Sequence, residues 1–302
     1  MIHMNSTGKV YFFRVKNISA TICGMSIDPL YPYAGTHAVQ NAIFAVEWAE
    51  PLRSDVLLDM LKLATKYRNL GLTTIQQQNA LSVNLTAARS TDVVPNVSSS
   101  QELGGLMFSA AASAAGVAGR SITISRQNCM VFIPDYTRWA KVWDDVHSYL
   151  SVALGVIAPM RPLTVAALQY TDVFQWKDDP SDMPLEKIFR NDTYMPPNIF
   201  SLKGLWHVHQ GYIQLSSTPV SNSRLENLNV DMLDTGGLRS IQITGAHRAT
   251  LSEPLWQAHL KNAPVLTQLF RDMHESNKDL LARLLTTEVC AKISLNEQKE
   301  TV

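Results

Sequence analysis

Alternating and helical patterns of apolar residues divide the central part of the chain into distinct elements. Apolar alternation predicts strands at residues 121–125 and 130–136, and a later strand at residues 165–176. Between them, Trp139 opens an apolar stripe at helical spacing, which predicts a helix over residues 137–156. This order of strand, strand, long helix and strand is typical of a fold that mixes α and β structure.

Further strands are predicted from runs of β-branched and aromatic residues. One covers residues 39–48, and two or three antiparallel strands lie between residues 107 and 133. Three more, at residues 204–215, 225–232 and 238–246, follow one another with short turns and predict an antiparallel meander.

Two further helices are predicted on either side of this β-rich region. Ser54 is a good N-cap for a helix over residues 54–69, and Gly71 ends it. Residues 263–285 carry a long apolar stripe, and a short helix begins at Thr287. The predicted fold class is therefore α+β, with antiparallel sheets packed against long amphipathic helices and a C-terminal helix closing the fold.

The pattern also predicts how the chain is divided. Residues 1–36 form an N-terminal β extension, residues 37–294 form the main α+β domain, and residues 295–302 form a frayed tail. The main domain divides alternatively into two α/β halves, at residues 37–105 and 106–294.

Two segments lack periodicity and are rich in turn-forming residues. Residues 89–101 are predicted to form a mobile loop, and residues 177–184 form a charged loop bounded by proline. Irregular segments of this kind are frequent places for binding residues.

Composition narrows the class of protein. The 26 basic residues balance the 26 acidic ones, and this neutrality counts against a nucleic-acid binder. Cys23, Cys129 and Cys290 lie far apart, which argues against a disulfide framework and for a reducing compartment. We expect a cytoplasmic protein that is not in the membrane, because neither a signal peptide nor a spanning apolar run is visible.

Three segments resemble a known bacterial family. Residues 39–52 end in Pro-Leu, and residues 121–174 contain a Tyr-x-x-Trp helix entry and a strand ending in Tyr-x-Asp-x-Phe. The third segment covers residues 273–289. With these motifs the chain resembles the sporadically distributed TIGR04255 family proteins, a family without settled chemistry. The resemblance implies an α+β fold and an accessory role, with host defence against phage as one interpretation.

The chain also departs from that family's pattern. It has additional β sequence before Tyr31, and Pro162 begins a segment that is usually arginine-rich. Residues 103–119 are unusually rich in alanine. The resemblance implies no catalytic residues for this chain.

His207 and His209 are the first candidates for chemistry. The period of two in a strand places both imidazoles on one face, where they could chelate a metal with Asp231 or His247 as the third ligand. The simpler interpretation is a polar, partly exposed strand face. We therefore predict no metal and no cofactor, and keep a metal-dependent hydrolase at this pair as an alternative.

Tyr170 and Asp172 share one face of a predicted strand. A carboxylate in an apolar strand needs a partner, and Arg161, Arg190 and Lys177 are the candidates. A structural ion pair is the favoured interpretation, and a binding site is the alternative.

Two pairs of polar residues lie three positions apart on predicted helices. Asp144 and His147 could form an acid–base pair, but they are better interpreted as a solvated helix face. His274 and Asn277 are interpreted as a buried polar pair that fixes how the C-terminal helix lies on the sheet. Cys129 has no neighbouring histidine in sequence that would make it a nucleophile.

No catalytic signature was found for common hydrolases, kinases or nucleotide-binding enzymes. The leading hypothesis is a non-enzymatic protein that binds a macromolecular partner or forms a homo-oligomer, with Trp206 and Tyr212 as exposed aromatic contacts. The alternative is nucleic-acid binding, in which the same two aromatic residues stack on bases from an antiparallel sheet.

Overall fold

The computed structural model describes residues 26–86, 96–112, 116, 118–192, 194–258 and 264–295. Most of the predicted N-terminal β extension, Cys23, residues 89–95 of the predicted loop and nearly all of the predicted tail lie outside the described residues.

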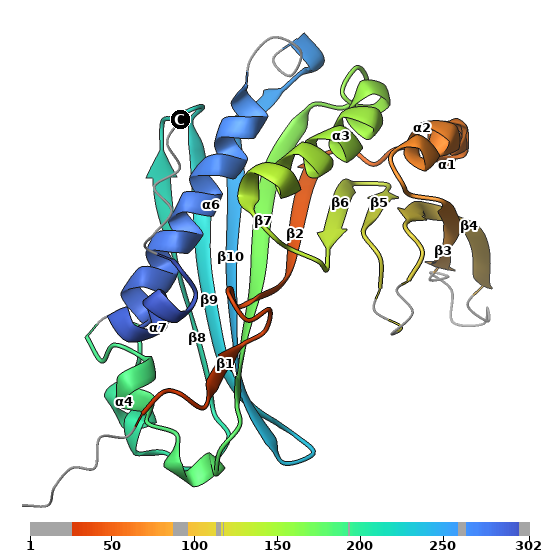
Figure 1. Cartoon of the computed structure of the whole chain (residues 1–302). Helices are drawn as coiled ribbons and strands as arrows, with labels where there is room; N and C mark the ends of the chain where they lie inside the picture. Colours follow the sequence, from red (N-terminus) through yellow and green to blue (C-terminus); the bar gives the residue numbers. More distant parts are fainter. Residues whose placement is uncertain are drawn as a thin grey trace, which may run out of the picture.

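One large antiparallel sheet dominates the molecule and confirms the mixed α+β class (Figure 1). Its strand order is β3-β4-β5-β6-β2-β7-β10-β9-β8, and β1 pairs separately with β7. The ten strands are β1 (Leu30–Pro32), β2 (Val39–Trp48), β3 (Thr74–Thr86), β4 (Asn96–Ser109), β5 (Ser121–Ser125), β6 (Asn128–Ile133), β7 (Leu163–Trp176), β8 (His207–Ser216), β9 (Asn222–Thr235) and β10 (Leu238–Leu255).

The two longest helices lie on the same face of this sheet (Figure 1). Helix α6 crosses in front of β8, β9 and β10, and α3 lies beside it over β7 and β2. The helices and 3₁₀ turns of the described chain are α1 (Ser54–Asp59), η1 (Met60–Leu63), α2 (Ala64–Asn69), α3 (Trp139–Ile157), η2 (Pro180–Asp182), α4 (Leu185–Ile188), η3 (Pro197–Ser201), α6 (Val265–Leu284) and α7 (Thr287–Lys292).

Two hydrophobic clusters fill the space between the sheet and the helices. The first includes Phe44, Trp143 and Phe270, and the ring centroids of Trp143 and Phe270 are 5.2 Å apart. The second includes Phe174 and Phe189, toward the end of the sheet where α4 and α7 pack. Because alternate strand residues point to opposite faces, β7 supplies both clusters mainly from even-numbered positions, such as Leu168 and Phe174.

The predicted helix over residues 54–69 is correct in extent but is not continuous. A 3₁₀ turn separates α1 from α2, and it aligns Leu57, Met60 and Leu63, which are buried at a spacing of three. The prediction that Ser54 is the N-cap is wrong. The cap position is Arg53, whose side chain makes no capping bond, and Ser54 is the first helical residue.

The predicted loop over residues 89–101 is wrong for its second half. From Asn96 onward these residues belong to β4, which pairs with β3 along a long hairpin. Strand pairing supplied the hydrogen bonds that the polar sequence alone did not predict. The last strand of the meander also runs further than expected, to Leu255, because Ala249 and Leu251 continue the buried alternation.

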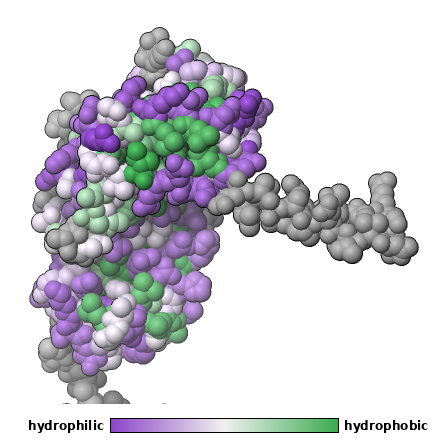
Figure 2. Space-filling view, turned by 90° about the vertical axis from the view of Figure 1, so that its right-hand side faces the viewer, coloured by the Kyte–Doolittle hydropathy of each residue, from purple (hydrophilic) through white to green (hydrophobic). Residues whose placement is uncertain are grey.

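The end of the molecule that carries α1 and α2 exposes apolar residues. Figure 2 shows a hydrophobic area there, surrounded by hydrophilic residues. Leu58 of α1 is 51% exposed and Ile75 of β3 is 38% exposed. No helix among the described residues combines the length and apolar character required to cross a bilayer.

Candidate functional site

A pocket between β7, the entry of α3 and the side of α6 brings together four residues that the sequence singled out. Tyr170 and Asp172 come from β7, and His274 and Asn277 come from α6. The pocket has a volume of about 100 Å³, and Trp139 forms part of its wall. The sequence identified these four residues in two separate pairs, and the packing of α6 on the sheet joins them.

Asp172 is a buried carboxyl group at the base of this pocket. It is 2% exposed, and its Oδ2 atom has no hydrogen-bond partner among the described residues. Burial raises the pKa of Asp172 to about 7, because the charged form loses its hydration.

The expected ion pair of Asp172 is wrong, since each proposed cation is engaged elsewhere. Arg161 Nη2 lies 3.6 Å from Glu50, and Arg190 donates a hydrogen bond to the carbonyl of Leu285. Lys177 lies over the ring of Tyr31.

His274 is held in its neutral form beside this carboxyl. Its Nδ1 atom lies 3.0 Å from the hydroxyl of Tyr170, and its ring stacks on Trp139 with centroids 4.3 Å apart. Burial, together with the positive charge of Lys278, lowers the pKa of His274 to about 3. The imidazole is therefore an uncharged wall of the pocket at neutral pH.

His37 adds a second unsatisfied polar atom. Its Nδ1 is buried and has no hydrogen-bond partner in the described part of the chain, and its ring meets Tyr136 edge-on at 6.0 Å. Burial lowers the pKa of His37, so this nitrogen is also uncharged at neutral pH. A pocket with two buried polar atoms left unpaired is prepared for a polar ligand.

The predicted pairing of His274 with Asn277 needs correction. Both residues face the sheet from α6, but Asn277 Oδ1 lies 3.2 Å from Nε2 of His247 on β10, whereas His274 bonds Tyr170 on β7. Each polar residue of the helix is thus attached to a different strand. Their expected structural role, fixing the helix on the sheet, is consistent with these bonds.

A buried charged row that the sequence reasoning missed continues from Asn277. His247 bonds Glu226 on β9, and Glu226 also forms an ion pair with Arg224. Burial acts to raise the pKa of Glu226, but His247 and Arg224 together hold it below its usual value. The signal was present, since Glu226 and His247 occupy inward positions of alternating strands where apolar residues are expected.

Gly245 leaves the space that the Asn277 side chain needs to reach His247. It lies on the helix-facing side of β10, and a side chain there would collide with Oδ1 of Asn277. The absence of a Cβ atom allows Asn277 to approach the strand and reach His247.

The other predicted site residues lie outside the pocket. His207 and His209 are exposed on the sheet face opposite α6, and His209 bonds the side chain of Asn229. His247, suggested as a third ligand, is buried in the row described above. The described residues contain no group of three or more side chains that could hold a metal ion.

Trp206 and Tyr212 do not form one aromatic surface. The prediction that Trp206 is exposed is wrong. This residue lies directly before β8 and is only 9% exposed. Tyr212 is 48% exposed but follows His209 by three positions, so it points to the opposite face of β8.

The remaining candidates are not gathered into a site. Asp144 and His147 are exposed on α3, and Arg120 pairs with Asp145 instead of Asp144. Cys129 is buried, and burial raises the pKa of its thiol, which keeps it protonated and unreactive.

Comparison with known proteins does not extend this description. No protein-family model matches the chain, and no curated protein matches it.

Proposed function

We propose that this chain is a binding protein whose pocket at Asp172 receives a primary ammonium group. The observation that carries the proposal is the buried, unpaired carboxyl of Asp172. A lone carboxylate in such a place is costly to the fold, and a bound cation would supply the missing partner.

The walls of the pocket fit the same ligand chemistry. Tyr136, Trp139 and Tyr170 line it, and aromatic faces attract cations when water is excluded. His274 is uncharged and does not repel a cation. Lys278 also lines the pocket, but Glu275 accepts hydrogen bonds from its ammonium group at 3.1 and 3.2 Å and offsets its charge.

Binding is favoured over catalysis because Tyr170, His274 and Asn277 already have hydrogen-bond partners. Tyr170 and His274 share a hydrogen bond, and Asn277 is committed to His247. The ammonium group could belong to a small amine or to a lysine of a protein partner. The cytoplasmic location, the accessory role and the link to host defence implied by the family resemblance remain part of this proposal.

A titration with n-butylammonium, which resembles a lysine side chain, tests the pocket. The wild-type protein should bind it, and Asp172→Asn should weaken binding by about tenfold or more, because a charged partner is lost. Asp144→Asn, which changes an exposed carboxylate on α3, should leave binding unchanged.

The pH dependence of this titration provides an independent check. The ammonium group needs an ionised Asp172, whose pKa is about 7. The affinity should therefore rise about tenfold between pH 6 and pH 8, where the ionised fraction grows from about a tenth to about nine tenths. Equal binding by wild type and Asp172→Asn would contradict the proposal.

Self-association is a second candidate function, favoured by the edge strand β8. Ile213 is 68% exposed and Leu215 is 81% exposed, and the strand contains no lysine, arginine, aspartate or glutamate. Edge strands usually carry charges or other features that prevent pairing with another chain. Nucleic-acid binding through Trp206 and Tyr212 receives no comparable support, since Trp206 is buried and cannot stack on a base.

A further inference from the structure

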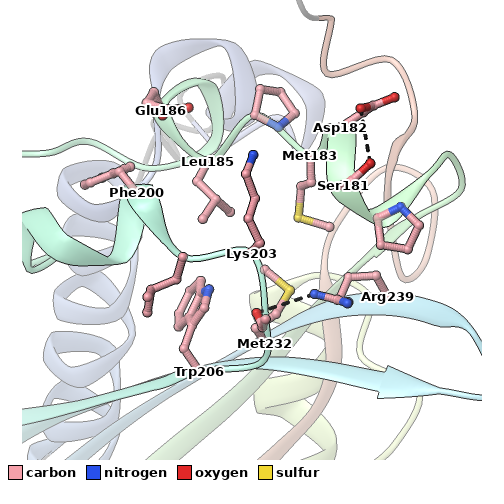
Figure 3. Close-up of a pocket in the computed structure, with 14 residues that line it drawn as sticks. Ser181, Asp182, Met183, Leu185, Glu186, Phe200, Lys203, Trp206, Met232 and Arg239 are labelled. Carbon is pink, nitrogen blue, oxygen red and sulfur yellow. Dashed lines mark hydrogen bonds between the residues drawn. The ribbon is translucent and has the colours of Figure 1, made fainter.

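A second pocket lies near the turn where β9 ends and β10 begins, and it shares no residue with the pocket at Asp172. It has a volume of about 110 Å³ and is bounded by residues 180–186, residues 202–204, Phe200, Trp206 and the two strand residues Met232 and Arg239. Figure 3 shows these side chains around a common space between η2, α4 and the strands β9 and β10.

Two N–H groups in the lining of this pocket have no acceptor among the described residues. Trp206 Nε1 and Arg239 Nε are buried, and neither has a hydrogen-bond partner in the described part of the chain. The nearest carboxylate to Arg239 is Asp234, and its Oδ2 atom is 3.7 Å from Nε, too far for a hydrogen bond. Buried donors without acceptors are rare in folded proteins, so their presence in one pocket calls for an explanation.

The charges around the space are arranged with the positive groups inward. Figure 3 shows Lys203 and Arg239 extending toward the middle, whereas Asp182 and Glu186 lie at the periphery. Asp182 is occupied by a hydrogen bond from Ser181. The inner surface therefore offers donors and positive charge to a ligand.

The remaining walls are apolar. Met183, Leu185 and Met232 surround the same space, and Trp206 contributes its ring as well as its N–H group (Figure 3). Methionine side chains adapt readily to apolar ligands of different shapes. A ligand that fills this pocket should thus combine one anionic end with an apolar body.

We propose that this pocket binds the carboxylate of an apolar molecule. Arg239 and Trp206 donate hydrogen bonds to the carboxylate, Lys203 covers it, and the methionines and Leu185 enclose the apolar body. A phosphate group fits less well, because its second negative charge would face Asp234 beside Arg239. The carboxylate belongs either to a free small acid or to the C-terminus of a peptide.

Calorimetric titration of the full chain with N-acetyl-leucine tests this assignment, with N-acetyl-leucinamide as the uncharged control. The acid should bind and the amide should not. Arg239→Gln should weaken binding by about tenfold or more, because it removes a charged donor. Trp206→Phe, which keeps the ring and removes only the N–H group, should weaken binding by about threefold to tenfold.

Arg248→Gln is the matched control, since Arg248 is an exposed arginine on the same strand and pairs with Glu47. It should bind the acid as the wild type does. Melting temperatures of all variants would show whether each remains folded, and Trp206→Phe keeps the test decisive if Arg239→Gln does not fold.

Acetylated tripeptides ending in leucine distinguish the two sources of the carboxylate. Tighter binding of the peptide with a free C-terminus than of N-acetyl-leucine identifies a peptide end, and equal binding identifies a small acid. Equal affinity for acid and amide, or no binding of the acid at about 10 mM, would overturn the proposal. Neither result would affect the ammonium proposal, which rests on Asp172.

Discussion

Asp172 and His274 titrate in opposite senses within one pocket. The pKa of Asp172 is raised from its ordinary 3.8 to about 7, so the native state keeps a proton that the unfolded state has lost between these values. The stability contributed by Asp172 thus falls as pH rises through this window. The pKa of His274 is lowered from 6.5 to about 3, so between these values only the unfolded state holds the proton, and stability rises with pH.

Asp172→Asn should separate these two effects. At pH 8 it should raise the free energy of unfolding by up to about 4 kcal/mol, since it removes the uncompensated buried charge. Between about pH 4 and 6.5 the contributions of Asp172 and His274 to stability change in opposite directions and nearly cancel in the wild type. The variant keeps only the contribution of His274, so its free energy of unfolding should rise steadily with pH.

Urea denaturation at several pH values measures this difference. Asp144→Asn serves as the exposed control and should follow the wild type. A variant Asp172→Asn that is less stable than the wild type at pH 8 would show that the carboxylate has a partner in solution.

Glu226 presents the contrasting case of a buried charge with partners. Glu226→Gln should destabilise the protein by about 3–5 kcal/mol, because it leaves Arg224 without its buried counter-ion and disturbs His247. Glu275→Gln removes a more exposed ion pair with Lys278 and should cost less than about 1 kcal/mol. Equal losses in urea denaturation would mean that the buried row contributes little.

The sequence indicated the residues of the candidate site but did not predict that they lie in contact in the folded protein. Strand alternation placed Tyr170 beside Asp172, and helical spacing placed His274 beside Asn277. Their contact depends on how α6 lies on β7, across 104 positions of sequence between Tyr170 and His274. Local patterns hold no information on such long-range packing, and the same limit produced the wrong partners for Asp172.

At the scale of elements, periodicity predicted most strands and helices because each buries one face. It failed where hydrogen-bonded partners decide the structure. The polar residues that open β4 look like a loop until β3 is known to pair with them. The position of β2 between β6 and β7 was likewise invisible in the sequence, since strand order depends on contacts between distant segments.

The edge strand β8 leads to a prediction about association. Leu215→Lys should reduce concentration-dependent self-association, because a lysine on an edge strand opposes pairing with a second strand. Sedimentation velocity at several protein concentrations measures the average mass and therefore the extent of self-association. Leu58→Lys, which changes an exposed leucine of α1, is the matched control.

The comparison of the two lysine variants gives a clear outcome. If Leu215→Lys alone lowers the average mass, the edge strand is the interface. If only Leu58→Lys does so, association occurs through the area beside α1 and α2, and the proposed role of β8 is wrong.

For the molecule as a whole, the sheet has one face covered by α3 and α6 and another that carries mainly polar residues. Gln169 of β7, Asn229 of β9 and Thr244 of β10 lie on that second face, which antiparallel sheets commonly expose to solvent. Both pockets are associated with the helix-covered side, one between β7 and α6 and the other near the turn between β9 and β10. The two proposed sites are chemically distinct, one for a cation and one for an anion.

The helix-covered side also depends on the glycine at position 245. Its missing methyl group leaves the space that Oδ1 of Asn277 occupies. A single added carbon at this position would displace the Asn277 side chain and separate it from His247. Because Asn277 also lines the pocket beside Asp172, the shape of that pocket depends on an atom that the chain does not have.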